Sequence, residues 1–249
     1  PLRDPRLRIV KTDASTDAEA LAAAAGNAHG AFLCVLDGDD QLDKVELLRD
    51  IQSGGDHGVH KVVVTPDQQG FYLICGNNAV KTETPATSPV APLWGDDHLL
   101  PRMPDGRGHN RHVLAPGGIV YRISKDGKTF ETFASGFRNI YGGAVNHDGE
   151  LFTYDADMEY DFNTPWYRPT RIYLCTPGGE LGWRSGAGNN AFPTLDMQPA
   201  LVDIGPGSPT GTTMGTGAKF PASYQRAFFA CDWTFATLYA IHLTPEAAR

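Results

Sequence analysis

The sequence predicts an all-β protein, and within that class a β-propeller that is incomplete in this chain. Turn-forming residues are abundant, with 28 Gly and 18 Pro among 249 residues. Short runs of aromatic and β-branched residues recur between these turns, as expected for many short strands. A helical pattern is plausible only at residues 15–25, where Thr16 or Asp17 could cap the first turn. Together these features favour strands over a helical bundle.

The strands are predicted from a weak internal repeat, in which a polar turn with Asp or Gly leads into an aromatic-rich run. The instances are HGAFLCVLDG (29–38), TPDQQGFYLICGN (65–77), NHDGELFTYDAD (146–157) and SYQRAFFACDW (223–233). Further strands are predicted at 61–65, 117–123, 128–134 and 237–243. The repeats are spaced irregularly, by about 40 to about 80 residues, which fits propeller blades with long insertions. The rival fold, an open sandwich, predicts more even spacing.

Composition excludes several partners. The net charge of -8 and pI near 5.4 argue against nucleic acid and anionic membranes, which both attract excess Lys and Arg. No apolar window of about 18 residues occurs, so no membrane span is expected. The cysteines form no CxxC or zinc-finger pattern and follow apolar runs, which predicts small buried strand residues. They are Cys34, Cys75, Cys175 and Cys231.

His57 is the candidate general base. It lies in a Gly-rich turn that leads directly into a predicted strand, where a side chain can project into the mouth of a barrel or propeller. An imidazole near its ordinary pKa suits removal of a hydroxyl proton. Asp56 could orient it, and His60 could complete a metal pair. The alternative is a loop histidine that is solvated or caps the turn.

Arg138 and Asn139 follow the predicted strand at 128–134 in SGFRNIYG. A guanidinium offers a planar fork of donors to a carboxylate or a quinone oxygen, and the amide can donate beside it. The alternative is an arginine that bridges loops between blades.

Two further polar segments are candidates. Asp155, Asp157, Glu159 and Asp161 alternate with other residues, which gives a solvated face if the segment is a strand and calcium ligands if it is a loop. The spacing excludes an EF-hand, as it does for a second acid cluster at 37–43. Thr210 lies in SPTG (208–211), which could bind a ligand through backbone and hydroxyl groups or could be a plain turn. No GxSxG elbow supports a serine nucleophile.

The chain resembles the soluble quinoprotein glucose and sorbosone dehydrogenases, and more closely the branch of secreted bacterial sorbosone-dehydrogenase-like proteins. The matching text includes GGDHGVHKVVVTPDQQGFYLICGN, GFRNIYGGAVNHDGELFTYDADMEYD, TPWYRPTRIYLCTPGGELGWRSG and DIGPGSPTGTTMGTGAKFPASYQRAFFACDW. The resemblance runs from about residue 32 to the end of the chain. It implies a six-bladed propeller that binds pyrroloquinoline quinone (PQQ) and calcium, with an N-terminal segment at 1–30 and a partial propeller at 31–249.

The resemblance also assigns roles. His57 matches the histidine that takes the proton of the anomeric hydroxyl, ten residues before the Asp of the PD turn. Arg138 and Asn139 match the cofactor-binding pair, and Thr210 is a third candidate for cofactor contact. The loop 155–158 matches the segment whose backbone carbonyls bind calcium in the family. Where the family has Gln-Gly-Pro this chain has Ala156, Asp157 and Met158, which suggests a side-chain site in place of a backbone site, with Asp155 and Asp157 as the metal candidates. Thr234 stands where the family has a cofactor-contacting lysine.

The expected function is therefore PQQ-dependent oxidation of a sugar or a sugar-derived alcohol or aldehyde. The implied partners are a small sugar-like substrate and a c-type cytochrome as electron acceptor, and the implied location is periplasmic or secreted. One alternative is a non-catalytic propeller that binds carbohydrate or a protein partner, which the threonine at Thr234 favours. A weaker alternative is a calcium-dependent hydrolase of the lactonase type.

Overall fold

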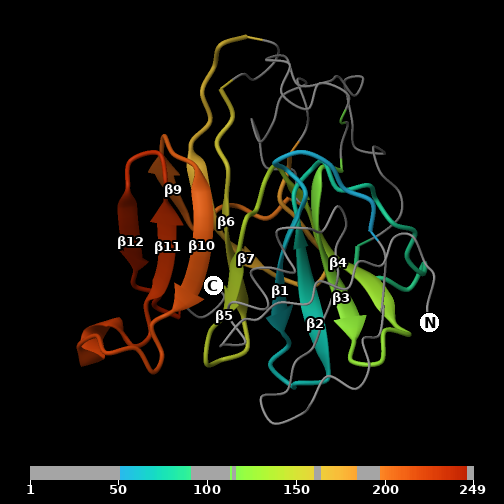
Figure 1. Ribbon diagram of the computed structural model, residues 1–249, viewed down its shortest axis with the longest axis horizontal. Helices are drawn as coiled ribbons and strands as arrows, with labels where there is room; N and C mark the ends of the chain where they lie inside the picture. The colour runs from blue at the N-terminus through green and yellow to red at the C-terminus, as the bar shows by residue number, and fades with distance from the viewer. Residues whose placement is uncertain (1–50, 91–112, 114–115, 160–163, 184–196, 246–249) are drawn as a thin grey trace, which may run out of the picture.

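The computed structural model describes residues 51–90, 113, 116–159, 164–183 and 197–245. Within these residues the protein is nearly all β, because twelve strands form three sheets and the single helical element is a short 3-10 turn, η1 (Ala222–Tyr224). The three sheets stand side by side in Figure 1. The predicted helix at 15–25, the strand at 29–38 and the acid cluster at 37–43 lie outside the described residues.

The first sheet contains the predicted strands from the middle of the chain. Its order is β1 (Val59–Val64), β2 (Gly70–Cys75), β3 (Gly118–Ser124), β4 (Phe130–Phe137) and β8 (Gly179–Glu180). The first four pair antiparallel as a meander, and β8 joins β4 in parallel. The turn between β1 and β2 is closed where Thr65 Oγ1 donates to Asp67 and Gln68 adopts a φ of 56°.

The second sheet follows directly. Its order is β5 (Gly143–Val145), β6 (Leu151–Asp155), β7 (Thr170–Cys175) and β9 (Val202–Gly205), all antiparallel. The tight turn between β5 and β6 depends on Asn146, whose Oδ1 accepts the N–H groups of Asp148 and Glu150. Gly149 supplies the positive φ of 91° that this turn needs.

The third sheet has the order β10 (Pro209–Met214), β11 (Phe228–Asp232) and β12 (Thr237–Ile241), again antiparallel. The prediction of a tight loop at 208–211 was wrong, since β10 begins at Pro209; Thr210 lies in this strand, where the pairing with β11 is irregular between Pro209 and Thr212. The prediction failed because proline is tolerated at the first residue of a strand, where no ladder donor is lost.

The packing of the sheets is that of propeller blades. The first strands β1, β5 and β10 lie next to one another, since β5 contacts both of the others. Lys61 Nζ reaches from β1 to the carbonyl oxygen of Thr212 on β10 at 2.7 Å. One apolar core, including Ile74 and Phe137, fills the space between the first and second sheets. A second, including Ile172, fills the space between the second and third. Within the described residues, the three sheets are therefore arranged as neighbouring blades of a propeller.

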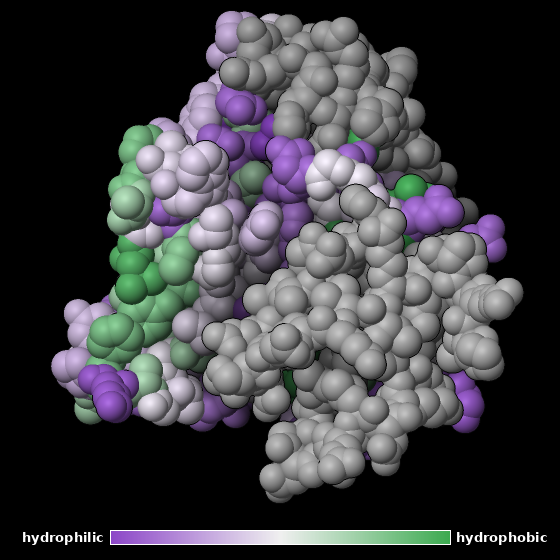
Figure 2. Space-filling model, viewed as in Figure 1, coloured by the Kyte–Doolittle hydropathy of each residue, from purple (hydrophilic) through white to green (hydrophobic). Residues whose placement is uncertain are grey.

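The face of the third sheet opposite the core that it shares with the second sheet exposes apolar side chains. Figure 2 shows apolar atoms gathered on the left, over the third sheet. The exposed residues from this sheet and its loops are Trp233, Phe235, Leu238, Phe220 and Tyr224. Cys231 lies here and is exposed, so the prediction of burial is wrong for it, whereas Cys75 and Cys175 are buried as predicted. Burial of a strand residue depends on whether a second layer covers its face.

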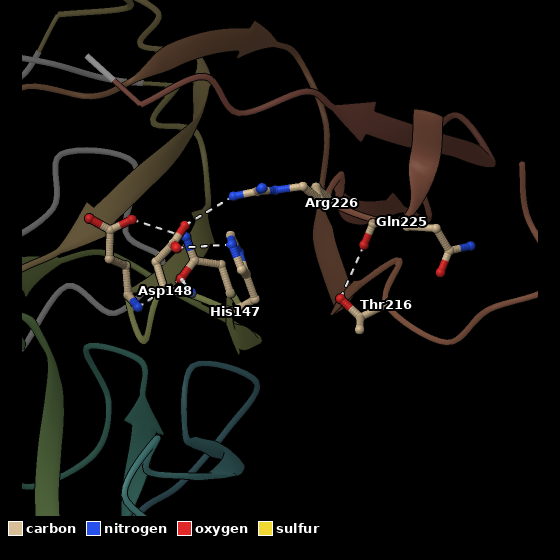
Figure 3. A network of polar contacts seen from close by, with 7 residues as sticks. His147, Asp148, Thr216, Gln225 and Arg226 are labelled. Atoms are coloured by element: carbon tan, nitrogen blue, oxygen red, sulfur yellow. Dashed lines mark hydrogen bonds and ion pairs between the residues drawn. The ribbon is translucent and has the colours of Figure 1, made fainter. Parts of the chain in front are cut away.

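The second and third blades are also joined at the lower end in Figure 1. Arg226, just before β11, approaches the Asp148 carboxylate of the β5–β6 turn at 3.3 Å. His147 Nε2 lies 2.9 Å from the other oxygen of the same carboxylate (Figure 3). These side chains are half-exposed, so the network links the blades without a large contribution to stability.

Candidate functional site

The predicted site residues gather at the end of the sheets opposite this network, the upper end in Figure 1. His57 precedes β1, Arg138 and Asn139 connect β4 to β5, and Asp155 ends β6. In a meander, every second connection lies at the same end, so the entry to each blade and its second-to-third strand connection meet there. The topology thus brings together residues that are far apart in the sequence.

His57 is buried and its ring is oriented by Asn77. Its exposed fraction is 5%. Nδ1 lies 2.6 Å from Asn77 Oδ1. An amide oxygen can only accept, so Nδ1 carries the proton and Nε2 keeps its lone pair. The imidazole is therefore held in the tautomer that a general base requires. Asp56, the orienting residue suggested by the sequence, instead offers its backbone carbonyl to Asn139 Nδ2 at 3.4 Å.

Asn77 also connects this histidine to the arginine loop. Its backbone N–H donates to the carbonyl of Arg138 at 2.8 Å, and the N–H of Asn78 donates to the carbonyl of His57 at 2.9 Å. Gly76 lies where these segments meet, and a Cβ there would approach Asn139 Oδ1 to 2.4 Å and the His57 carbonyl oxygen to 2.6 Å. The close approach of the two loops requires glycine at this position.

Asn139 contacts the first blade through its side chain. His60 Nε2 donates to Asn139 Oδ1 at 2.8 Å, and the His60 ring stacks on Tyr141 with centroids 4.1 Å apart. Burial lowers the pKa of His60, although the contact to Asn139 and the charge of Asp56 act in the opposite direction. Burial thus favours the neutral form of the His60 imidazole, whose Nε2–H orients the side-chain amide of Asn139.

The guanidinium of Arg138 is buried, with a side-chain exposure of 6%. Nη1 donates to the carbonyl of Asp157 at 2.7 Å, and Nη2 approaches Glu159 Oε2 at 3.4 Å. The arginine therefore holds the connection after β6 as well as its own loop. A buried cation is retained only where acceptors surround it.

Asp155 is buried and binds backbone amides. Oδ2 accepts the N–H of Arg138 at 2.9 Å, and Oδ1 accepts those of Asn139 at 2.7 Å and Ala156 at 2.8 Å. Burial raises the pKa of this carboxyl, while the three N–H groups and the Arg138 charge favour its ionised form. Both carboxylate oxygens are thus used to hold the Arg138 loop.

Asp157 lies nearer to solvent, and Tyr167 donates its hydroxyl to Asp157 Oδ2 at 2.9 Å. Burial raises the pKa of Asp157, and the neighbouring Glu159 acts in the same direction. Within the described residues, no three His, Cys, Asp or Glu side chains are grouped to hold a metal ion. Asp161 lies outside them.

Thr210 and Thr234 lie at the third blade. Thr210 Oγ1 donates to the Cys231 carbonyl at 3.1 Å, a contact between β10 and β11. Thr234 Oγ1 donates to Ser208 Oγ at 2.9 Å, in the turn after β11. Both hydroxyls have neighbours within their own blade.

Asn77 and Tyr141 are site residues that the sequence did not reveal. Asn77 is separated from His57 by 20 residues, and only the β1–β2 pairing brings the two together. The Gly-Asn step at the end of the strand FYLIC was the available signal, because a polar residue directly after a buried strand faces the end of the sheet.

The sheets, their packing and the loops at one end define a β-propeller with a polar site at the mouth. Neither a known protein family nor a curated protein sequence matches the chain. Among solved structures, it is similar to the PQQ-bound form of aldose sugar dehydrogenase from Streptomyces coelicolor, with 16% identity and a TM-score of 0.52. The match covers 82% of this chain and 51% of that one, so the chain spans about half the length of the dehydrogenase. The likeness establishes the fold. No helix of the described residues is long and apolar enough to cross a membrane.

Proposed function

We propose that the protein is a PQQ-dependent dehydrogenase that oxidises a sugar or a sugar-derived alcohol or aldehyde. The observation that carries the proposal is the meeting of an oriented imidazole, His57, with Arg138 and Asn139 at one end of the propeller. The likeness to a PQQ-bound aldose sugar dehydrogenase supports the same chemistry. Loops at the mouth of a propeller are a common place for such sites.

The chemical types of the side chains at this end of the blades are compatible with an anionic quinone. Arg138 keeps a buried guanidinium at this end, in a chain whose net charge is -8, and Asn139 and His60 add neutral polar groups. Arg138 and Asn139 would hold the cofactor oxygens, with Thr210 at the third blade as a further contact. When bound, PQQ would supply an ortho-quinone that accepts a hydride, that is, one proton with two electrons, from the substrate carbon.

The role of the protein in this reaction follows from the tautomer of His57. Nε2 would take the proton of the substrate hydroxyl as the C–H hydrogen leaves with its electron pair, so that the C–O bond becomes a carbonyl. Asn77 would keep Nδ1 protonated during this step and stabilise the ring as it becomes positively charged. The loops around Gly76 would hold base and cofactor ligands in register.

The side chain of Asp155 is poorly suited to bind calcium. Its two oxygens already accept three backbone N–H groups, and the Arg138 cation lies beside it. A calcium ion needs six to eight oxygen ligands, as a rule. The proposed proton transfer needs no cation at Asp155. Asp157, whose carboxylate accepts hydrogen bonds from the Tyr167 hydroxyl and the Gly207 backbone, remains the candidate for a calcium neighbourhood.

The test is reconstitution of the protein with PQQ and calcium, followed by dye reduction with a panel of sugars. We expect activity with at least one aldose, and His57→Gln should reduce kcat by about 10²- to 10⁴-fold. His147→Gln, at the opposite end of the blades, is the matched control and should keep full activity. Absence of PQQ binding by the intact protein would refute the proposal.

A second candidate is a non-catalytic propeller that binds carbohydrate or a protein partner. Thr234, in place of a cofactor-contacting lysine, favours it, because Thr234 Oγ1 is turned to Ser208 and offers no charge. This candidate predicts binding of a sugar without PQQ and no dye reduction. A lactonase-type hydrolase would need several acidic or amide side chains around one axial metal.

The remaining parts of the proposal follow from the same resemblance. Electrons would pass from the reduced cofactor to a c-type cytochrome, and the protein would act in the periplasm or outside the cell. Reduction of a purified c-type cytochrome in place of the dye tests the first part. Fractionation of cells that express the full-length protein tests the second.

A further inference from the structure

Asp155 has contacts that the proposed reaction leaves without a role. It is the last residue of β6 and has an exposed fraction of 6%. Its carboxylate receives the backbone N–H groups of Arg138, Asn139 and Ala156, all within 2.9 Å. Two of these donors belong to the residues that are the candidate cofactor ligands. Hydrogen bonds from N–H groups to an ionised carboxylate are among the stronger ones in proteins.

The same arrangement occurs in the next blade. Asp232 is the last residue of β11 and has an exposed fraction of 2%. Oδ2 accepts the N–H of Ser208, and Oδ1 accepts that of Phe235, both at 2.9 Å. Ser208 lies directly before β10, just as Asn139 lies shortly before β5. In both blades, a buried carboxylate at the end of the second strand binds the segment that enters the first strand.

The first blade lacks this carboxylate. Cys75 is the last residue of β2, and its thiol is buried. There the entering segment is held by backbone bonds, from Gly76 N–H to the Gly58 carbonyl and from Asn78 N–H to the His57 carbonyl. The buried carboxylate thus occurs in the two blades where it binds the segment entering the first strand, and this backbone binding accounts for its position without a bound cation.

We propose that Asp155 is a positioning residue, whose carboxylate anchors the backbone of Arg138 and Asn139 and thereby presents both side chains to the site, instead of coordinating calcium. The positive ends of three N–H groups point at its oxygens and would oppose a divalent cation there. The anchoring rests on these contacts alone. The inference that this anchoring supports cofactor binding rests on the proposed function.

The first experiment measures backbone hydrogen exchange in Asp155→Asn. The amide group keeps the size of the side chain but loses the charge and one acceptor. We expect the amides of Arg138 and Asn139 to exchange about 10- to 100-fold faster, with no change at Ser208. Asp232→Asn is the mirrored control, and it should speed exchange at Ser208 and Phe235 instead. Unchanged exchange at Arg138 and Asn139 in Asp155→Asn would overturn the proposal.

The second experiment separates positioning from calcium binding. Calorimetric titration with calcium alone should give the same affinity for the wild type and Asp155→Asn, or no binding by either. A tenfold or greater loss of calcium affinity in Asp155→Asn alone would overturn the proposal. Asp203→Asn removes a carboxylate that is 63% exposed on β9, and is the control for a general loss of negative charge.

The third experiment uses PQQ without substrate, followed by fluorescence. Asp155→Asn should bind PQQ at least tenfold more weakly than the wild type, whereas Phe130→Leu, a core substitution at the start of β4 and away from the site, should lower stability and change the affinity less than threefold. Equal losses in the two variants would mean that Asp155 acts only through stability, and would overturn the proposal. If the wild type does not bind PQQ, the proposed function fails, and the exchange experiment still decides the anchoring.

Discussion

Gly76 is the residue at which a single methyl group most directly tests the meeting of the two site loops. In Gly76→Ala the new Cβ would lie 2.4 Å from Asn139 Oδ1, 2.6 Å from the His57 carbonyl oxygen and 2.8 Å from its carbonyl carbon. Ordinary contacts at such a carbon begin at 3.4 Å. The Asn139 side chain and the His57 backbone must therefore move apart by roughly 1 Å.

The size of the effect follows from this displacement. Overpacking of a filled site costs about 1–3 kcal/mol of unfolding free energy. A shift of about 1 Å in a catalytic group costs about 100-fold in rate, even when the chemistry is untouched. We expect Gly76→Ala to lose stability by this amount and to lose more activity than the stability loss explains.

Urea unfolding and PQQ-dependent dye reduction measure the two effects. Gly54→Ala is the matched control, since its Cβ would meet nothing within 4 Å in the same entering segment. Its φ is outside the positive range that penalises side chains. If Gly76→Ala behaves like Gly54→Ala in both assays, the loops do not meet as described and the site is wrong.

Three further predictions concern the base, its neighbour and the core. Asn77→Asp places a carboxylate beside Nδ1 of His57, which should raise the pKa of the imidazole. The acid limb of the pH–rate profile should then move to higher pH, and activity at pH 6 should fall roughly tenfold. An acid limb that does not move would contradict the role assigned to Asn77. Because burial lowers the pKa of His60, its folded form binds a proton less readily than the unfolded chain, so stability present above pH about 6.5 should decline as pH falls. His60→Gln should remove that part of the decline in urea unfolding, and an identical slope in the variant would disprove it. Ile172→Ala, in the core between the second and third blades, should cost about 2–5 kcal/mol, whereas Leu238→Ala on the exposed face should cost about 0.5 kcal/mol or less by thermal unfolding.

Most strands of the fold could be predicted from the sequence, because aromatic and β-branched runs between Gly- and Asp-rich turns mark them directly. The run at 117–123 is β3 (Gly118–Ser124), and that at 237–243 is β12 (Thr237–Ile241), each to within two residues. The two-residue strand β8 has no such run, since its parallel pairing with β4 depends on tertiary contacts. Exposure of Cys231 could not be predicted either, because a strand sequence does not reveal whether its face is covered.

The candidate site was predicted less completely. His57, Arg138 and Asn139 were candidates from residue type and position, their roles were taken from the family resemblance, and the topology brings them to one end of the blades. Their partners depend on register, so Asn77 was missed although it contacts both His57 and Arg138. The buried contacts of Asp155 were also missed, because alternation with apolar residues suggested a solvated face or a cation site.

The mouth formed by the entries to β1 and β5 is the proposed binding site for PQQ, beside His57. A crystal structure of the full-length protein with PQQ tests it most directly. We predict the cofactor at this end of the blades, in contact with Arg138 and Asn139, with Nε2 of His57 facing its quinone oxygens across the substrate position. A cofactor bound at the opposite end, near the His147–Arg226 network, or no bound cofactor at saturating concentration, would show that this mouth is not the PQQ site.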